Sequence, residues 1–436
     1  MKRINIGLIG FGVVGTGVYR ILLENSPLIQ ERLGGELIVN GISVRDLKGE
    51  RGVEFDRALL TTDPFKIVNN PETDIVIELM GGCDPALDLV LTAVKNGKHV
   101  VTANKALLAI HGREIFSACN TYGVDLGYEA SVGGGIPVIR TMREGFAANR
   151  FKSLYGILNG TCNYILSRMS EEGTPFAEVL KDAQAKGYAE ADPTFDIEGT
   201  DTAHKIAILA SIAFGGFVRF EDIHTEGISE ITPVDLEFAK EFGYRIKLLA
   251  LAKEVGELVD IRVHPTMVQE KSPISSINGV LNAVGIVGDM VQESLLVGAG
   301  AGSLPTASAV AGDIIEVARN MIYGGAGRLN SASGSLEGGT ENIKIKKIDE
   351  VESKYYLRFR VSDRPNVLSQ ISGIFGNCSI SIGSVIQKGR NENGSVPLVI
   401  MTHRAVEKNI KKAVSQISTL DVVCGKPVLI RVEKDI

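Results

Sequence analysis

A glycine-rich motif, Gly10-Phe11-Gly12-Val13-Val14-Gly15, lies between a short apolar run, Ile4–Ile9, and a helical segment that includes Val18–Leu23. In a strand–turn–helix unit, this G-x-G-x-x-G spacing is typical of a dinucleotide site. The glycines allow a tight turn and a close approach of the backbone to a pyrophosphate, and the helix N-terminus offers unpaired N–H groups. We expect residues 10–15 to bind a dinucleotide; the alternative is a glycine-rich turn without a ligand.

Short β-branched runs alternate with helical segments beyond this motif. Leu37–Val44, Asp74–Met80 and His99–Thr102 read as strands, and Pro85–Asn96 reads as a helix. This alternation predicts an α/β fold with a Rossmann-type parallel sheet. Apolar residues on one face of a helix at Ala307–Tyr323 indicate that this helix returns to pack on the first domain.

The chain has 436 residues, which exceeds what one hydrophobic core usually organises. We expect residues 1–130 to form the dinucleotide-binding domain, with a returning helix at 305–325. Residues 131–304 form an α+β second domain. Residues 326–350 are expected to be a linker, because its first half is rich in Gly, Ser and Asn. A C-terminal domain is expected at 353–434.

The C-terminal domain has a regular order of elements in the sequence. Strand and helix patterns follow one another as β-α-β-β-α-β, which predicts a ferredoxin-like fold. The expected elements are Tyr355–Val361, Val367–Phe375, Ile380–Ile386, Val396–Thr402, Val406–Ser418 and Val428–Val432.

Composition argues against several classes of protein. The net charge of −6 comes from interspersed acids and bases, so no nucleic-acid partner is expected. The N-terminus lacks the apolar run of a signal peptide, and the longest apolar stretch, Ile206–Val218, is too short to span a membrane. Five scattered cysteines fit a reducing, cytoplasmic setting, and the six histidines have no metal-ligand spacing.

Basic residues near the end of the second strand bear on the choice of cofactor. An acid there binds the ribose of NAD, whereas a basic residue meets the 2′-phosphate of NADP. Arg45 can offer a bidentate fork to a phosphate and Lys48 a point charge, with Arg51 close behind. These residues favour NADP. NAD stays possible, because Asp46 could bind a ribose hydroxyl and Arg45 could be a solvated loop charge.

Four further blocks have a specific spacing. They are Val101–Leu108, with Lys105 at the carboxyl end of a strand, the glycine-rich Tyr128–Pro137, Gly156–Tyr164, and the acidic Gly187–Lys205. Together they resemble homoserine dehydrogenase along essentially the whole chain. The resemblance implies NADP(H)-dependent interconversion of L-aspartate 4-semialdehyde and L-homoserine in threonine, methionine and isoleucine biosynthesis. It also makes residues 131–304 a catalytic substrate and dimerisation domain.

Carboxylates and amines in the last block suit an amino alcohol. Asp201 and Lys205 are i and i+4 on one helix, and Glu190 precedes them. The resemblance implies that Gly187, Glu190 and Asp201 bind homoserine. Lys205 or Lys105 exchanges the proton, and we favour Lys205 as the donor, with Lys105 orienting substrate and nicotinamide. The alternative is a surface ion pair between Asp201 and Lys205.

A cation and a second cofactor contact also follow from the resemblance. A monovalent cation, Na⁺, would be held by backbone oxygens of Glu129, Val132, Gly134 and Ile136; the alternative is a turn that shapes the cofactor cleft. A return segment, Gly298–Gly302 followed by Leu304–Ala307, would lie near the nicotinamide, where small residues allow close approach.

The segment Val361–Leu368 resembles the turn of an ACT domain, an amino-acid-sensing module. The resemblance implies threonine as an effector and a homodimer or homotetramer. Asn366 and Asn377-Cys378-Ser379 stand where such domains often carry glycine, although Asn tolerates positive φ. A dimerisation module without an effector is the alternative.

Two other functions fit the pattern less well. One is a Rossmann dehydrogenase for a related aldehyde or imine, and the other is a catalytically silent sensor that binds NADP. The presence of both lysines and both carboxylates argues against the second.

Overall fold

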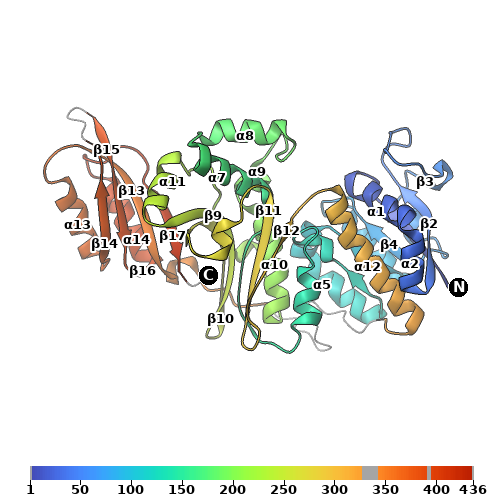
Figure 1. Ribbon diagram of the computed structural model, residues 1–436. Coiled ribbons are helices and arrows are strands. Elements are labelled where there is room, and N and C mark those ends of the chain that lie inside the picture. Colours follow the sequence, from blue (N-terminus) through green and yellow to red (C-terminus); the bar gives the residue numbers. More distant parts are fainter. Residues whose placement is uncertain (1, 327–341, 390–393, 435–436) are drawn as a thin grey trace. The chain divides into compact units, whose positions relative to one another are not determined.

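The computed structural model describes residues 2–326, 342–389 and 394–434 (Figure 1). It divides into two compact units. Unit 1 contains Met1–Leu154, Ala203–Ile223 and Asn282–Ile343, and unit 2 contains Tyr155–Thr202, His224–Leu281 and Lys344–Ile436. Within the described ranges, no helix combines the length and the apolar character needed to cross a bilayer.

Unit 1 contains a six-stranded parallel sheet of order β3-β2-β1-β4-β5-β6. The Rossmann-type sheet predicted from the sequence is confirmed. Its strands are β1 (Lys2–Ile9), β2 (Gly35–Ser43), β3 (Leu60–Thr61), β4 (Ile75–Glu78), β5 (His99–Thr102) and β6 (Leu126–Gly127). Its helices are α1 (Val13–Glu24), α2 (Ser26–Leu33), α3 (Phe65–Val68), α4 (Ala86–Lys95), α5 (Lys105–Tyr122), α6 (Val138–Arg140) and α12 (Ser303–Tyr323).

Helix α12 packs along α1. Val310, Ile314 and Val317 of α12 are buried in one core with the residues of β1. A close approach of the two helices depends on Gly17, because a Cβ atom there would lie 3.0 Å from the side chain of Ala307. The apolar stripe on α12 therefore fixes where the chain rejoins the nucleotide-binding half.

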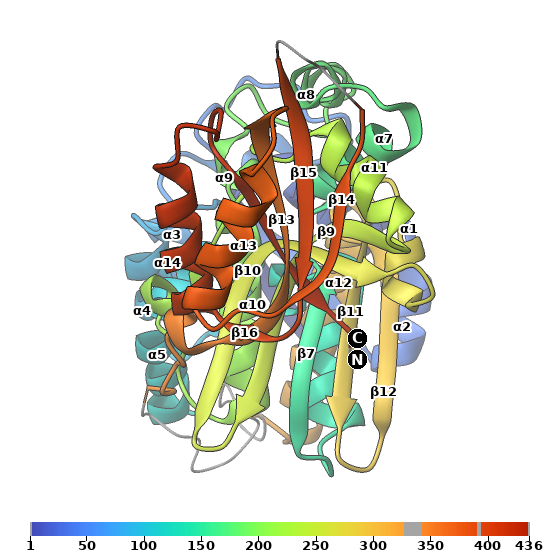
Figure 2. The same cartoon turned by 90° about the vertical axis from the view of Figure 1, so that its left-hand side faces the viewer.

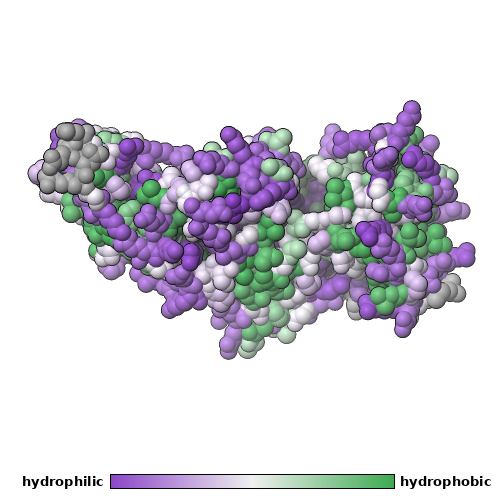
Figure 3. All heavy atoms as spheres, turned by 45° about the horizontal axis from the view of Figure 1, so that its top comes forward, coloured by the Kyte–Doolittle hydropathy of each residue, from purple (hydrophilic) through white to green (hydrophobic). Residues whose placement is uncertain are grey.

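Two further strands, β11 (Leu281–Gly288) and β12 (Gln292–Ala299), belong to unit 1 except for Leu281, the first residue of β11. β12 is an edge strand, and most of its residues are half-buried or exposed. Val297 of this strand is 45% exposed. Figure 3 shows hydrophobic side chains gathered near the middle of the view. An exposed apolar edge strand favours pairing with another chain.

Unit 2 is organised around the long antiparallel pair β9 (Tyr244–Val255) and β10 (Leu258–Gln269). The other elements before the C-terminal region are α7 (Gly160–Glu172), α8 (Phe176–Ala185), α9 (Thr194–Ile197), β8 (His224–Thr225) and α11 (Pro233–Glu241). β7 (Phe151–Ile157) and α10 (Thr200–Phe214) carry residues of both units.

The C-terminal region of unit 2 has strands in the order β17-β13-β15-β14, and helices α13 and α14 pack beside each other (Figure 2). This is the predicted ferredoxin-like order. β17 also pairs in parallel with β10, with Arg431 opposite Thr266. The elements are β13 (Glu352–Ser362), α13 (Val367–Asn377), β14 (Ile382–Gln387), β15 (Ser395–Thr402), β16 (Ala405–Val406), α14 (Glu407–Ser418) and β17 (Val428–Glu433).

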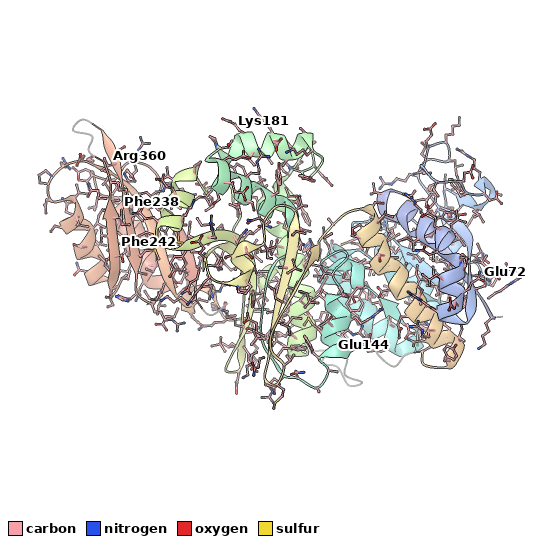
Figure 4. The ribbon with its side chains drawn as sticks, viewed as in Figure 1. Glu72, Glu144, Lys181, Phe238, Phe242 and Arg360 are labelled. Atoms are coloured by element: carbon pink, nitrogen blue, oxygen red, sulfur yellow. The ribbon has the colours of Figure 1, made fainter. Side chains whose placement is uncertain are left out.

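Alternation along β13 gives the C-terminal sheet two packed faces. Tyr355, Leu357 and Phe359 are fully buried in the core with α13 and α14. Tyr356 and Arg358, which point to the opposite face, both donate to the carboxylate of Asp235 on α11. Figure 4 labels Phe238 on the same helix, and the Lys388 ammonium lies 5.7 Å from the centre of its ring.

The predicted linker, residues 326–350, lies largely outside the described residues, which omit 327–341. The part of the predicted linker that the structure describes from Lys344 onward forms backbone hydrogen bonds with β10 of unit 2. The Val259 N–H donates to the Lys344 carbonyl at 3.0 Å, and the Lys346 N–H donates to the Val259 carbonyl at 2.9 Å.

Two turns of the C-terminal region keep a left-handed backbone without glycine. Asn366, at the start of α13, has φ 74°, and Ser379, after that helix, has φ 57°. Asn tolerates this conformation better than most residues, whereas Ser adopts it less readily. The turns expected to carry glycine therefore retain their shape.

Candidate active site

The glycine-rich turn opens onto a cleft of about 320 Å³ in unit 1. The residues that line it come from the ends of parallel strands, where ligands bind in open α/β sheets. They include Gly10, Phe11 and Gly12 of the motif, Arg45, Asp46 and Arg51 after β2, and Leu79 and Met80 after β4.

The three motif glycines have different physical reasons to be glycine. Gly10 has φ 101°, and a Cβ atom there would lie 2.6 Å from the Leu79 carbonyl oxygen. A Cβ atom on Gly15 would lie 2.3 Å from the Gly10 carbonyl oxygen. Gly12 is different, because a Cβ atom there would meet no protein atom within 4 Å. Packing thus requires Gly10 and Gly15, whereas the space beside Gly12 is left for a ligand.

The N-terminus of α1 is available to an anion. Gly12 is the N-cap residue and supplies no side-chain hydrogen bond to the first turn. Gly302, which has φ 126°, immediately precedes α12, and the Ser303 hydroxyl donates to the Val13 carbonyl at 2.8 Å. The structure thus brings Gly302 and the motif together.

The basic residues after β2 are placed differently from one another. Arg45 is exposed and lines the cleft, whereas Lys48 is exposed and is not among the residues lining it. Arg51 donates one guanidinium nitrogen to the Phe11 carbonyl at 3.1 Å and another to the Asp46 carbonyl at 2.6 Å. Arg51 therefore fixes the turn through two backbone carbonyl groups while it also lines the cleft, a role that its sequence position alone did not indicate.

Lys105 is the first residue of α5, directly after β5, and it is half-buried. Asn104 caps this helix by accepting a hydrogen bond from the Leu107 N–H, and its amide group donates to the Gly82 carbonyl at 2.6 Å. Beside it, the Thr102 hydroxyl donates to buried Glu78 at 2.7 Å, and burial raises the pKa of Glu78. Two loops after neighbouring strands are thus held together around Lys105.

The proposed cation loop is tightly built. The Glu129 carboxylate accepts the backbone N–H groups of Ile139 and Arg140, both at 2.8 Å, so both of its oxygens hold the start of α6. The Glu129 N–H donates to Asp313, whose pKa burial raises to about 7, with a further contribution from the Glu129 charge. Gly134 is left-handed, and a Cβ atom there would lie 2.6 Å from the Gly300 carbonyl carbon.

Within the described residues, no group of three or more His, Cys, Asp or Glu side chains could hold a metal ion. Any cation at residues 129–136 would therefore depend on the backbone oxygens of Glu129, Val132, Gly134 and Ile136. Such uncharged donors suit a monovalent cation better than a transition metal.

The acidic block of unit 2 is held by the N-terminus of α7. The Asn159 amide group donates to Asp196 at 2.8 Å and to Asp201 at 2.9 Å, while its oxygen accepts the Cys162 N–H. Asp201 is 1% exposed. The Thr161 hydroxyl donates to the Tyr188 carbonyl at 2.6 Å, which ties the turn after α8 to the same helix end.

The remaining predicted substrate residues lie near these elements or on α10. Gly187 has φ 72°, and both Gly187 and Glu190 are exposed; the Glu190 carbonyl accepts a hydrogen bond from Gln184. Lys205 is 8% exposed and lies one helical turn after Asp201 on α10. Glu190 and Asp201 belong to unit 2, whereas Lys105 and Lys205 belong to unit 1.

Sequence reasoning assigned no role to Asn159 or Asp196, and it named Arg51 only as a basic residue near the predicted cofactor phosphate. A signal existed for Asn159, because Asn immediately before a helical segment is a favoured N-cap. No local signal marked the hydrogen bonds from Asn159 to Asp196 and Asp201, because the two acids lie in α9 and α10, more than thirty residues away.

The parallel sheet and the open glycine turn at a helix N-terminus define a Rossmann-fold dinucleotide-binding protein. Residues 10–129 match the sequence model described as homoserine dehydrogenase, NAD binding domain, and residues 137–315 match the homoserine dehydrogenase model. The chain therefore belongs to the homoserine dehydrogenase family, and it is an NAD(P)-dependent oxidoreductase.

Individual relatives agree along the chain. Homoserine dehydrogenase of Neisseria gonorrhoeae is 46% identical over 434 residues, which covers 99% of each chain. The crystal structure of a homoserine dehydrogenase from Thiobacillus denitrificans is 46% identical, has a TM-score of 0.93 and covers 100% of this chain and 99% of that chain. A hyperthermophilic archaeal homoserine dehydrogenase in complex with NADPH is 26% identical, with a TM-score of 0.63 over 72% of this chain and 97% of that chain.

Proposed function

We propose that this enzyme interconverts L-aspartate 4-semialdehyde and L-homoserine with NADP(H), as a step in threonine, methionine and isoleucine biosynthesis. The observation that carries the proposal is the acidic block, in which Asn159 holds Asp201 one turn before Lys205 on α10. An amino alcohol needs acids for its ammonium group and an amine for its hydroxyl proton. We assign nucleotide binding to residues 1–130 with 305–325, and substrate binding to residues 131–304.

NADP fits the cleft of unit 1. Gly12 leaves room for a pyrophosphate beside the uncapped start of α1, and Gly302 lies at the neighbouring end of α12. Arg45 is exposed at the cleft and can meet a 2′-phosphate, whereas Lys48 can contribute charge only from outside the lining. The NADPH complex of the archaeal relative supports NADP as the preferred cofactor. When bound, the nicotinamide supplies or accepts the hydride.

The residues of the chain would handle the substrate and its proton. Glu190 and Asp201 bind the α-ammonium group, with Gly187 shaping the turn between them and α8. Lys205 gives a proton to the aldehyde oxygen during reduction and takes it back from the hydroxyl in the reverse direction. Lys105, at the carboxyl end of β5, orients the substrate.

A sodium ion fits the loop at residues 129–136. The Glu129 side chain is engaged with α6, so its backbone oxygen, with those of Val132, Gly134 and Ile136, would form the donor set. The ion would stiffen the loop that packs against Gly300.

The C-terminal region would act as a threonine-sensing ACT domain, residues 353–434. Its support is the ferredoxin-like order and the left-handed Asn366 at the turn after β13. We also propose a homodimer or homotetramer, supported by the exposed edge strand β12. A cytoplasmic setting is consistent with the five cysteines, all within the described residues, none of which forms a disulfide.

A direct assay tests the proposal. Purified protein is given homoserine and either NADP or NAD, and absorbance at the reduced-nicotinamide band is followed with and without threonine. We expect homoserine-dependent reduction, faster with NADP at low cofactor concentration and slowed by threonine. Reduction with other amino alcohols but not homoserine would indicate a related dehydrogenase, and no reduction at all would indicate a sensor.

A further inference from the structure

An ion cluster around a buried arginine joins the last strand of the chain to the segment that follows β8. Arg431 of β17 is 1% exposed and uses both terminal nitrogens on the Glu226 carboxylate, at 2.8 and 2.9 Å. Its Nε also donates to Glu407, the first residue of α14, at 3.0 Å. Burial opposes ionisation of Glu226, yet hydrogen bonds from His224 and Arg431 hold its pKa below the ordinary value. Glu226 is therefore a fixed anion.

The strand that carries Arg431 is itself anchored. Two residues later, Glu433 accepts hydrogen bonds from Arg262 and Lys253 of the β9–β10 pair, each at 2.6 Å. Arg431 and Val432 lie in register with Thr266 and Met267 of β10. The guanidinium group of Arg431 is thus held at a set position. The segment of Glu226 is also attached to β10, because β8 pairs in parallel with that strand and the Glu226 N–H donates to the Val263 carbonyl at 2.8 Å. The side-chain pair with Arg431 adds a second attachment to this backbone pairing.

The residues after Glu226 lie directly on the acidic block. A Cβ atom on Gly227 would come within 2.6 Å of the Glu198 Cα atom, so the two backbones touch there. The Ile228 N–H donates to the Ile197 carbonyl at 2.8 Å, and the Ser229 hydroxyl donates to Glu198 at 2.8 Å.

The turn on the other side of this contact leads to the predicted substrate acid. Gly199 has φ 84°, and a Cβ atom on it would lie 3.0 Å from the Thr225 side chain. Asp196, just before Ile197, and Asp201, just after the turn, share the Asn159 amide. A shift of segment 224–229 would therefore displace the backbone from which Asp201 projects.

We infer that Arg431 and Glu226 are positioning residues for the amino-alcohol site: the C-terminal strand and β10 together hold segment 224–229, and that segment holds the turn that places Asp201. The inference rests on the proposed role of Asp201 in substrate binding. It gives the C-terminal region a part in the reaction that is separate from any effector it binds.

The first test compares three variants of the full-length enzyme. Glu226→Gln keeps the shape of the side chain and removes its charge, and Arg431→Lys keeps the charge and removes the fork. Arg358→Lys is the matched control, because Arg358 makes the same kind of fork from β13 to Asp235 on α11. We expect the first two variants to raise the KM for homoserine roughly fivefold to tenfold, as for loss of a charge-assisted hydrogen bond, and to leave the KM for NADP unchanged. The control should leave both unchanged.

The second test does not depend on turnover. Amide hydrogen exchange is measured by mass spectrometry in peptides that cover residues 194–202. Exchange should be faster in Glu226→Gln and Arg431→Lys than in the wild type and in Arg358→Lys, while thermal unfolding shows that all variants are folded. Equal exchange in all four proteins, or an unchanged homoserine KM, would overturn the inference. If the wild type fails to oxidise homoserine, the proposed function fails, and the exchange experiment still decides the positioning.

Discussion

The side-chain amide nitrogen of Asn159 lies 2.9 Å from Oδ2 of Asp201, and this hydrogen bond joins the start of α7 to the start of α10. The same side chain caps α7 through its oxygen, which accepts the Cys162 N–H at 2.8 Å. The cap holds the amide in place, so the direction of the Asp201 carboxylate depends on a helix end forty-two residues earlier in the chain.

Asn159→Asp separates these two roles. An aspartate can still cap α7, but it cannot donate to Asp201 and adds a third carboxylate beside Asp196 and Asp201. We expect the KM for homoserine to rise by about tenfold or more, because loss of a buried donor costs about 1–3 kcal/mol. The KM for NADP should be unchanged. Steady-state kinetics with each substrate varied in turn check this, and an unaltered homoserine KM would remove Asn159 from the site.

Lys205→Ala should lower kcat by orders of magnitude while the protein still binds NADP. The amine that exchanges the proton is lost, whereas the glycine turn and Arg45 are untouched. Lys105→Ala is the comparison, and we expect it to affect the homoserine KM more than Lys205→Ala does. Turnover numbers and fluorescence titration with NADPH separate the two effects. An unchanged kcat in Lys205→Ala would show that another residue exchanges the proton with the substrate oxygen.

Local sequence patterns predicted the helices and strands well where hydrophobic periodicity and turn-forming residues indicate the same boundaries. β5 has the predicted bounds, and α12 extends only four residues before the predicted Ala307. The start of α1 was not predicted, because this helix begins at Val13, within the glycine motif. Helix α2 was not predicted either, because its apolar face is too short to give a clear periodic pattern. Helix starts after glycine are hard to place because glycine itself lowers helix propensity.

Pairings between distant segments could not be predicted in this way. The parallel pairing of β17 with β10 joins residues 165 positions apart, as for Thr266 and Arg431. The sequence of neither strand indicates which strand it pairs with. Alternation of apolar and polar side chains shows only which residues face the core. The contacts of Asn159 and Arg431 depend on such pairings, and so the supporting residues of the site were missed while its acids and lysines were proposed.

Cofactor choice can be tested with two arginines that lie a few residues apart. Arg45→Ala should raise the KM for NADP about tenfold and leave that for NAD nearly unchanged, because only NADP carries the 2′-phosphate that a fork would meet. Arg51→Ala should weaken both cofactors, because Arg51 binds the carbonyls of Phe11 and Asp46 and shapes the turn. Initial rates at saturating homoserine give both values. Equal effects of Arg45→Ala on NADP and NAD would exclude it from phosphate binding.

Lys247 gives the protein a pH-dependent stability term. Burial lowers its pKa to about 8, and its ammonium donates to Asn163, Ile277 and Asn278. Between about pH 8 and the unfolded value near 10.5, the unfolded chain binds more protons, so stability should rise with pH. Lys247→Met removes the titrating amine and with it this pH-dependent contribution to the free energy of unfolding. Denaturant unfolding at pH 7, 9 and 10 should show the wild type gaining roughly 1–3 kcal/mol on the variant as pH rises. A constant difference would contradict the prediction.

Gly15→Ala should lower the stability of the protein, whereas Gly12→Ala should lower its affinity for NADP. A Cβ atom on Gly15 would press on the Gly10 carbonyl oxygen at 2.3 Å, so the alanine should lower the unfolding temperature and with it all activity. A Cβ atom on Gly12 would meet no protein atom within 4 Å, and the backbone there has negative φ, so the folded protein should keep its unfolding temperature. Its affinity for NADP should nevertheless fall, because the methyl group would occupy the space where the pyrophosphate approaches α1. Calorimetry and NADP titration on both variants check this. Unchanged NADP binding in Gly12→Ala would mean that the open space beside the turn is not where the cofactor lies.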